Sequence, residues 1–367
     1  MASNDLAIIG ASYLQLPLIE KAKELGYVTH VFAWAANDVG EAAADYFYPI
    51  SIVEKEAIRE KCGEIGICGV CSIASDLAAI TVNYVAAAFG LTGNSLEATA
   101  KSTNKHLMRL AFEANGDPSP KSRLVDENTD LSALQLAYPI IVKPTDRSGS
   151  RGICKLSSSE GLQDAVTHAI TESFEKQALV EEFAEGDEYS VEFISFRGEH
   201  HFLALTQKFT TGAPYFIETG HREPADVSDQ TLERVKSVVQ HALDSLGLKN
   251  GASHSEVKID SKGTIRIIEI GGRMGGDCIG SDLVRYSTGV DFVRAVIQVA
   301  CGRKPDLEPV CTPCSAEVRF LLSQEDVDEF ERIRESNRIL KVVDYHPENL
   351  GLTTDSSNRA GCYIIRT

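Results

Sequence analysis

The chain has 367 residues, of which 43% are hydrophobic and 24% are charged, and its formal net charge is −17. A chain of this length and composition can bury a sizeable core and is expected to form two or three domains. The negative charge argues against a nucleic-acid partner and against an anionic membrane surface, because both require basic patches.

No apolar run approaches the roughly 20 residues that a membrane span requires. The N-terminal segment, MASNDLAII, lacks the basic region and the long apolar stretch of a signal peptide. We therefore expect a cytoplasmic protein without a membrane partner, whose nine scattered cysteines are reduced thiols. The C-x-x-C pairs Cys68/Cys71 and Cys311/Cys314 could together bind zinc, but the first pair lies in an apolar run typical of a buried strand, so no zinc site is expected.

The first 94 residues alternate short apolar strands with helices, which predicts a parallel sheet. The expected elements are a strand at 6–10, a helix at 16–25, strands at 28–32 and 65–73, and a helix at 77–89. Gly10 begins only a fragment of the G-x-G-x-x-G pattern, so NAD binding is not supported. We expect residues 1–94 to form a small doubly wound α/β domain.

The remaining residues predict a larger region of mixed strands and helices. The expected elements are helices within 95–112, a turn or linker at 115–120, a strand at 138–143, a helix at 159–174, a strand at 178–183, an antiparallel pair at 189–196 and 201–208, a helix between Ser228 and Gly247, a hairpin within 254–273, a helix at 291–300, a strand at 316–322, a helix at 325–335 and a strand at 362–366.

A lysine and a glycine-serine loop follow the strand at 138–143. The sequence IVKPTDRSGSRGI begins at residue 141, so that the strand delivers Lys143 and the loop occupies 148–152. Glycine lets the backbone approach phosphate oxygens closely, and successive N–H groups form an anion-binding concavity. The lysine precedes the loop, so this is not a P-loop. The pattern alone leaves open a phosphate site or a mobile polar hairpin tip.

An apolar strand that ends in acids follows at 179–190, with the sequence LVEEFAEGDEYS. An exposed backbone beside an apolar slot can hydrogen-bond to an adenine edge, and a carboxylate beyond the turn can hold ribose hydroxyls. The alternative is an ordinary solvated loop, because acids often cluster in loops.

Two glutamates, Glu256 and Glu269, lie in β-like runs separated by the turn-like segment 260–263. If Ile259 faces Thr264, both glutamates point to one face of the hairpin, offset diagonally by roughly 7–8 Å between Cα atoms. Carboxylates that converge in this way suit Mg²⁺ together with phosphate oxygens. The alternative is two ordinary hairpin acids, and a slip of one residue would place them on opposite faces.

Taken in order, these motifs resemble the ATP-grasp superfamily. The resemblance starts with Lys105 in STNKHLMR, continues through the motifs above, and ends with Arg273 after the second glutamate, so that it runs from about residue 95 to 302. It implies an α/β fold in which a doubly wound N-terminal domain at 1–94 precedes a two-subdomain ATP-grasp domain at 95–303. The lid subdomain would span about 115–186, and a small C-terminal α/β segment at 304–367 would pack on the core.

The resemblance also implies ATP and Mg²⁺ (or Mn²⁺) as cofactors, with roles for individual residues. The implied contacts of ATP are Lys105 and Lys143 to the phosphates, the lid loop with Ser148, Gly149 and Ser150, the adenine hinge with Glu181, Glu182, Phe183 and Ala184, and Glu188 to the ribose. Glu256 and Glu269 would bind the metal. Lys143 and Arg273 would be catalytic, with Arg273 stabilising the acyl-phosphate and the intermediate that follows.

One position departs from the family pattern. The family usually has E-x-N after the second strand, with the asparagine as a further metal ligand, whereas this chain has Gly271 two residues after Glu269. Asp277 is a candidate substitute. We expect an altered site rather than an inactive one.

The segment YFIETGHREP at 215–224 resembles one found in amino-acid ligases of the superfamily, and His254 before Glu256 resembles their H-x-E motif. The resemblance therefore implies an enzyme that activates a small carboxylate, such as an amino acid, as an acyl-phosphate and joins it to an amine. Candidate substrate contacts are Glu218, His221, Arg222 and His254. Alternatives are a purine-biosynthetic or carbamoyl-phosphate synthase-like enzyme and a non-catalytic ATP-binding protein. Small molecules are the expected partners, and a homodimer is a further expectation.

Overall fold

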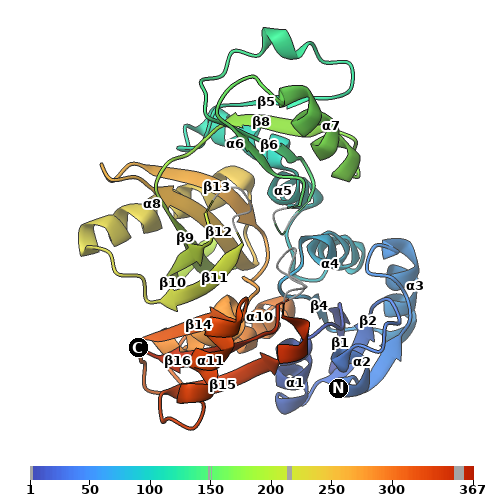
Figure 1. Cartoon of the computed structure of the whole chain (residues 1–367). Helices are drawn as coiled ribbons and strands as arrows, with labels where there is room; N and C mark the ends of the chain where they lie inside the picture. Colours follow the sequence, from blue (N-terminus) through green and yellow to red (C-terminus); the bar gives the residue numbers. More distant parts are fainter. Residues whose placement is uncertain (1–2, 148, 150, 213–216, 351–358) are drawn as a thin grey trace.

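The computed structural model describes residues 3–147, 149, 151–212, 217–350 and 359–367. It contains a parallel sheet near the N-terminus and two antiparallel sheets, which we call sheets A, B and C in chain order (Figure 1). This arrangement confirms the predicted α/β class with a doubly wound N-terminal part.

Sheet A has the strand order β3-β2-β1-β4, and its pairs are parallel. Its strands are β1 (Asp5–Ile9), β2 (Val28–Phe32), β3 (Tyr46–Tyr48) and β4 (Gly69–Cys71), and its helices are α1 (Leu16–Glu24), α2 (Val39–Ala43), α3 (Lys55–Ile65) and α4 (Asp76–Phe89). The strand predicted at 65–73 is shorter than expected. Ile65 ends α3, because Gly66 adopts a left-handed conformation (φ +77°) that terminates the helix.

Sheet B has the order β5-β8-β6-β7 and is antiparallel. Its strands are β5 (Ser122–Val125), β6 (Ile140–Pro144), β7 (Cys154–Leu156) and β8 (Ala178–Glu182), with α7 (Leu162–Glu172) packed on them and a 3₁₀ turn at Leu131–Ala133. Helices α5 (Leu96–Thr103) and α6 (Lys105–Asn115) precede this sheet and lead the chain from sheet A into it.

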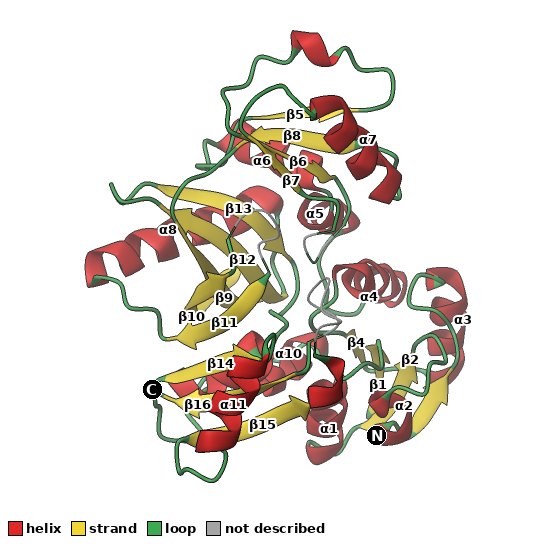
Figure 2. Ribbon diagram, in the orientation of Figure 1, coloured by secondary structure: helices red, strands yellow, loops and turns green. Residues whose placement is uncertain are grey.

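Sheet C is the largest, with eight described strands in the order β13-β12-β9-β10-β11-β14-β16-β15. Its strands are β9 (Asp187–Phe196), β10 (Glu199–Thr210), β11 (Glu218–Glu223), β12 (Gly251–Ile259), β13 (Ile265–Gly271), β14 (Ala316–Phe320), β15 (Ile339–Tyr345) and β16 (Gly361–Arg366). The accompanying helices are α8 (Asp229–Leu246), a π-helix (Ile279–Leu283), α9 (Val284–Thr288), α10 (Phe292–Ala300), α11 (Gln324–Ile333) and a 3₁₀ turn (Pro347–Asn349). The strands after residue 304 therefore extend the same sheet that carries the two glutamates (Figure 2).

The two faces of sheet C differ in character around β9, β10 and β12. One face buries Val191, Leu205 and Val257 against the apolar stripe of α8. The other carries acids and bases, because side chains alternate between the faces along each strand. This polar face lies beside sheet B and α6, and it is the setting of the candidate site. No helix in the described residues is both long enough and apolar enough to cross a membrane.

Candidate active site

The two glutamates lie directly opposite each other on β12 and β13. They share a face, as predicted, but the predicted register was wrong. Ile259 pairs with Ile265 and not with Thr264, because Asp260 and Thr264 close a three-residue loop through a backbone hydrogen bond of 3.1 Å. A β-bulge between Glu256 and Val257 then leaves Ile268 as an extra residue on β13. The bulge brings Glu269 level with Glu256, which illustrates how bulges re-aim side chains at functional sites.

Each glutamate is bound by a different buried lysine. Lys105 Nζ lies 2.9 Å from Glu269 Oε1 and also donates to the carbonyl oxygen of Arg147 at 2.7 Å. Lys208 Nζ lies 2.7 Å from Glu256 Oε1. Burial would raise the pKa of Glu256, but the Lys208 ammonium and His254 outweigh it and hold that pKa well below its ordinary value. Both carboxylates are therefore oriented by cations on their inner side.

Lys208 is the centre of a larger cluster. Its ammonium also lies 2.9 Å from Glu188 and 3.3 Å from Glu218. Burial would lower the pKa of Lys208, but the three carboxylates raise it well above its ordinary value, so the lysine is charged. Its side chain is 4% exposed, whereas those of Glu188, Glu218 and Glu256 are 24–27% exposed. The bases form an inner layer and the acids an outer layer that solvent can reach.

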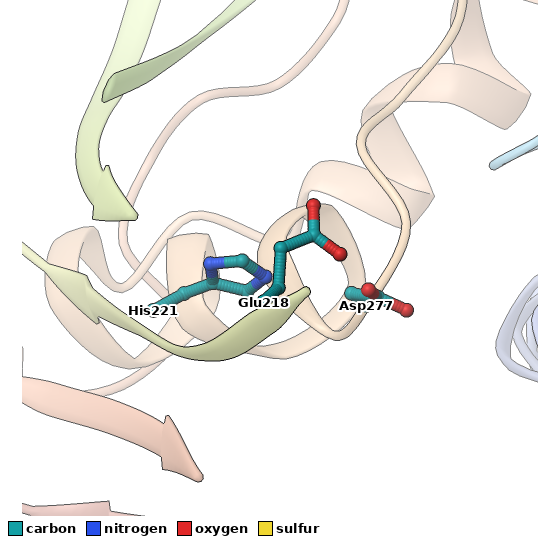
Figure 3. Close-up of side chains that lie close together, drawn as sticks. All are labelled: Glu218, His221 and Asp277. Carbon is teal, nitrogen blue, oxygen red and sulfur yellow. The ribbon is translucent and has the colours of Figure 1, made fainter. Parts of the chain in front are cut away.

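A second group of charges continues this outer layer at the end of β11. Figure 3 shows Glu218, His221 and Asp277 close together, and one ligand atom from each lies within 4.8 Å of the others. Arg359 binds both acids at 3.0 Å. Burial would raise the pKa of Glu218, but Lys208, His221 and Arg359 outweigh it and lower that pKa to about 2. A bulge also shifts the register between β10 and β11. It leaves Thr219 without a partner on β10 and places Glu218 on the same face of β11 as His221.

His221 is buried, and its two ring nitrogens have no hydrogen-bond partner among the described residues. Burial lowers the pKa of His221 to about 3, so the imidazole is neutral. Buried polar atoms are rarely left unpaired, so this ring is available to a ligand at the cluster. Arg222, the next residue, points elsewhere: it pairs with Glu317 and lines a separate cavity of about 330 Å³ with Phe209 and Arg319. The structure does not bring Arg222 to the candidate site.

The catalytic lysine expected on sheet B is buried in an ion pair. Lys143 on β6 pairs with Glu181 on β8, and Arg109 of α6 binds the other oxygen of Glu181 at 3.0 Å. Burial lowers the pKa of Lys143, and Glu181 offsets this only in part. The side chain of Glu181 therefore orients Lys143, and its backbone is committed to both neighbouring strands of sheet B.

The expected adenine hinge lies where β8 leaves sheet B for sheet C. The Phe183 ring stands between the ammonium groups of Lys155 and Lys258, at 3.5 and 4.8 Å from its centroid. The N–H groups of Glu182 and Phe183 donate to the backbone of Lys121 and Pro139. Ala184 N–H, by contrast, makes no backbone hydrogen bond within the described part of the chain. An amide that remains available beside an apolar ring suits the edge of a purine.

The lid loop is described only in part. Gly149 is exposed and has a left-handed backbone (φ +70°), which favours glycine. Ser148 and Ser150 lie outside the described residues. The base of the loop is anchored by Lys105, which binds both the Arg147 carbonyl and Glu269.

His254 and Arg273 complete the polar face. His254 Nδ1 forms a short contact with Glu192, and Gly275 N–H donates to the same carboxylate at 3.0 Å. Burial alone would lower the pKa of His254, but Glu192 raises it to about 9, so the ring is protonated near neutral pH. Arg273 makes two hydrogen bonds to Asp76, of 2.9 and 3.1 Å.

Comparison with known proteins assigns part of the chain to a family. Residues 136–282 match the family model of the ATP-grasp domain. The protein contains an ATP-grasp domain. The alanine–anticapsin ligase of Bacillus subtilis is 26% identical over 309 residues, which cover 74% of this chain and 64% of the relative, so the chain spans less than two thirds of that protein.

Two solved structures share the fold of the whole chain. The L-amino acid ligase from Bacillus licheniformis superposes with a TM-score of 0.81 at 22% identity and covers 100% of this chain and 93% of that one. A phosphoribosylglycinamide synthetase from Anaerococcus prevotii superposes with a TM-score of 0.77, also at 22% identity, over 99% and 93% of the two chains. The similarity of fold therefore extends beyond the residues that match the family model.

Several residues of this candidate site were not predicted from the sequence: Lys208, Arg359, Asp76, Arg109 and Glu192. Lys208 carried a weak signal, because a lysine that follows the apolar run at 202–205 in a strand must find a partner or reach solvent. Asp76 and Arg359 carried none, since each comes from a segment far from the motifs and meets its partners only in the folded chain.

Proposed function

We propose that the protein is an ATP-dependent ligase that activates a small carboxylate, such as an amino acid, as an acyl-phosphate and joins it to an amine. The observation that carries this proposal is the pair of opposed glutamates, Glu256 and Glu269, each oriented by a buried lysine beside the lysine of sheet B. The alanine–anticapsin ligase relative supports the substrate class, because its name describes the joining of an amino acid.

On this proposal the nucleotide binds between sheets B and C. Ala184 N–H and the Phe183 ring would receive the adenine, and Glu188 would accept hydrogen bonds from the ribose. Lys105, which binds the Arg147 carbonyl at the base of the predicted lid loop, and Lys143 would hold the phosphates.

The residues present fit a magnesium ion. The carboxylates of Glu188, Glu218 and Glu256 share the single ammonium of Lys208, and their side chains are 24–27% exposed, so that carboxylate oxygens at this face remain open to a cation. Glu256 and Glu269 would hold Mg²⁺ through oxygen atoms, the ligands that this ion prefers. When bound, the ion would neutralise phosphate oxygens and so reduce their repulsion of an incoming carboxylate.

The cluster at Glu218 is proposed as the site of the substrate's ammonium group. A second divalent ion is less suited to it, because Arg359 already binds both acids and Lys208 lies 3.3 Å from Glu218. A zwitterionic amino acid brings only one positive charge to this cluster, and its carboxylate can be bound by the neighbouring cations. Neutral His221 can accept a hydrogen bond from the ammonium.

The reaction would then proceed in two steps. A carboxylate oxygen of the substrate attacks the γ-phosphorus of ATP, the bond to the β-γ bridging oxygen breaks, and ADP leaves. A deprotonated amine next attacks the acyl carbon, and phosphate departs as the C–N bond forms. Arg273 would carry the charge that develops on the acyl oxygen, since a fixed guanidinium stabilises such an oxyanion without reorganisation.

The test is release of ADP and phosphate with single amino acids and with pairs of amino acids, in the presence of Mg²⁺ and ATP. The proposal predicts release that depends on a carboxylate and an amine, with a dipeptide-like product in mass spectrometry. Activation by bicarbonate or by a ribosylamine alone would assign the protein to the purine-biosynthetic or carbamoyl-phosphate class. Tight ADP binding without turnover in any mixture would identify a non-catalytic binder.

A further inference from the structure

Asp76 brings a carboxylate from the N-terminal sheet into the candidate active site. It is the first residue of α4, directly after the N-cap Ser75, and it lies at the carboxyl end of β4. Its two oxygens bind Arg273 Nε at 2.9 Å and Arg273 Nη2 at 3.1 Å, and both side chains are 17% exposed. A two-point contact of this kind fixes the plane of the guanidinium as well as its position.

The Asp76 carboxylate occupies the space in which a side chain at position 271 would lie. A Cβ atom added to Gly271 would stand 2.8 Å from Asp76 Oδ1 and 3.2 Å from Arg273 Nε. Residues 269 and 271 point to the same face of β13, so that side chain would have been the neighbour of Glu269. The glycine is therefore what allows the Asp76–Arg273 pair to form beside the metal carboxylates.

A second contact joins the same two segments, the one that leads into α4 and the one that follows β13. Ala74 N–H donates to the carbonyl oxygen of Met274 at 3.2 Å, and a Cβ on Gly276 would touch the Ala74 Cβ at 3.4 Å. Ala74 has a φ of +58°, a left-handed conformation that is unfavourable for a residue with a side chain. Such strain persists only where the surrounding structure imposes it, and it is concentrated at functional sites.

We infer that Asp76 is a positioning residue, which holds Arg273 in the orientation that the proposed ligase reaction needs, and that Gly271 is required to make room for it. The inference rests on the proposed function. Gly271 is then an adaptation of this site and not a sign that catalysis has been lost. Arg273 is then held in the orientation for catalysis only when the N-terminal part of the chain, which supplies Asp76, is docked beside it.

The kinetic test compares Asp76→Asn and Asp76→Ala with Asp229→Asn. Asp229 is the matched control, since it follows the N-cap Ser228 of α8 as Asp76 follows Ser75, but it is exposed and has no arginine partner among the described residues. We expect Asp76→Ala to lower kcat by about 100-fold, the scale of a small misplacement of a reacting group. KM for ATP and the dissociation constant of ADP should change by less than about 3-fold, and Asp76→Asn should retain part of the rate because its amide oxygen still accepts one hydrogen bond. An unchanged kcat, or equal losses of kcat and ADP affinity, would refute the positioning role.

A stability test does not depend on any enzymatic activity. Gly271→Ala should lower the melting temperature of the wild-type protein because the added methyl group meets Asp76. The same change in an Asp76→Ala background should lower it much less, since the clashing carboxylate is gone. Equal effects in both backgrounds would refute the steric relationship. If the wild type releases no ADP with any substrate while this coupling is observed, the proposed function fails and the structural relationship between Gly271 and Asp76 stands.

Discussion

Glu256 and Glu269 face each other across β12 and β13, and the lysines that orient them come from opposite sides, Lys208 from sheet C and Lys105 from α6. The site is therefore assembled from two parts of the chain that meet along the polar face of sheet C. The Lys105–Glu269 contact, the Arg109 hydrogen bond to the Ile268 carbonyl at 2.7 Å and the Ile270 N–H contact with Met108 Sδ at 3.4 Å link α6 to β13.

Glu269→Gln should lower the rate of ADP formation by at least about 100-fold, which corresponds to ~2.7 kcal/mol of transition-state stabilisation. The change removes a charge from the proposed metal ligands while preserving the shape of the side chain. ADP release is measured by a coupled assay, with circular dichroism as the check on folding. The exposed Glu185→Gln serves as control, and wild-type activity in Glu269→Gln would remove this residue from the metal site.

Lys208→Met should destabilise the protein by about 3 kcal/mol, because three carboxylates would lose the cation that neutralises them. The midpoint of urea unfolding measures the effect, and the exposed Lys304→Met is the control. Millimolar Mg²⁺ should raise the midpoint more in the variant than in the wild type. An unchanged midpoint would show that the cluster contributes no net stability.

Glu223 predicts a pH dependence of stability. It is buried, hydrogen-bonded to Thr206 and Ser287 at 2.7 and 2.6 Å, and burial raises its pKa from 4.5 to about 8. The neutral form contributes stability that is complete below pH 4.5 and is lost progressively as pH rises toward 8, by about 1.4 kcal/mol for each pH unit. Glu223→Gln keeps a neutral hydrogen-bonding group, so its unfolding free energy should fall less steeply over this window. Parallel pH profiles for the variant and the wild type would contradict this assignment; Glu233→Gln on the exposed face of α8 is the control.

Lys143→Met should weaken ADP binding by at least about 10-fold, or ~1.4 kcal/mol, because a buried ammonium beside the phosphates is lost. Glu181 would retain its contact with Arg109, so sheet B should remain folded. Isothermal titration calorimetry gives the affinity, and the exposed Lys121→Met is the control. Equal ADP affinity in the wild type and Lys143→Met would exclude Lys143 from the phosphate site.

Local patterns were enough to predict much of the fold. The strand at 28–32 and the helix ends at Gly90 and Gly247 agree with the structure, because apolar periodicity and left-handed glycine caps are local signals. The common face of Glu256 and Glu269 followed from the two-residue period of a strand. The register did not, since the bulge at Ile268 has no signature in a run of isoleucines.

The ion-pair partners of the site residues could not be predicted from the sequence. Arg359 meets Glu218 across 141 residues, and Asp76 meets Arg273 across 197. The first pair depends on where β16 joins sheet C, and the second depends on how sheets A and C dock. No local pattern encodes either arrangement. The wrong prediction for Arg222 has a different cause. Its side chain points away from its neighbour His221 because successive residues of a strand alternate between faces, a local rule under which both could not be contacts of one site.

The most direct test of the central claim is a crystal structure of the protein with Mn²⁺ and ADP, using anomalous diffraction to locate the metal. The account predicts an anomalous peak within about 2.0–2.3 Å of carboxylate oxygens from both Glu256 and Glu269, with ADP phosphates as further ligands. A metal bound only at Glu218, His221 and Asp277, or ADP phosphates remote from Lys143 and both glutamates, would contradict it.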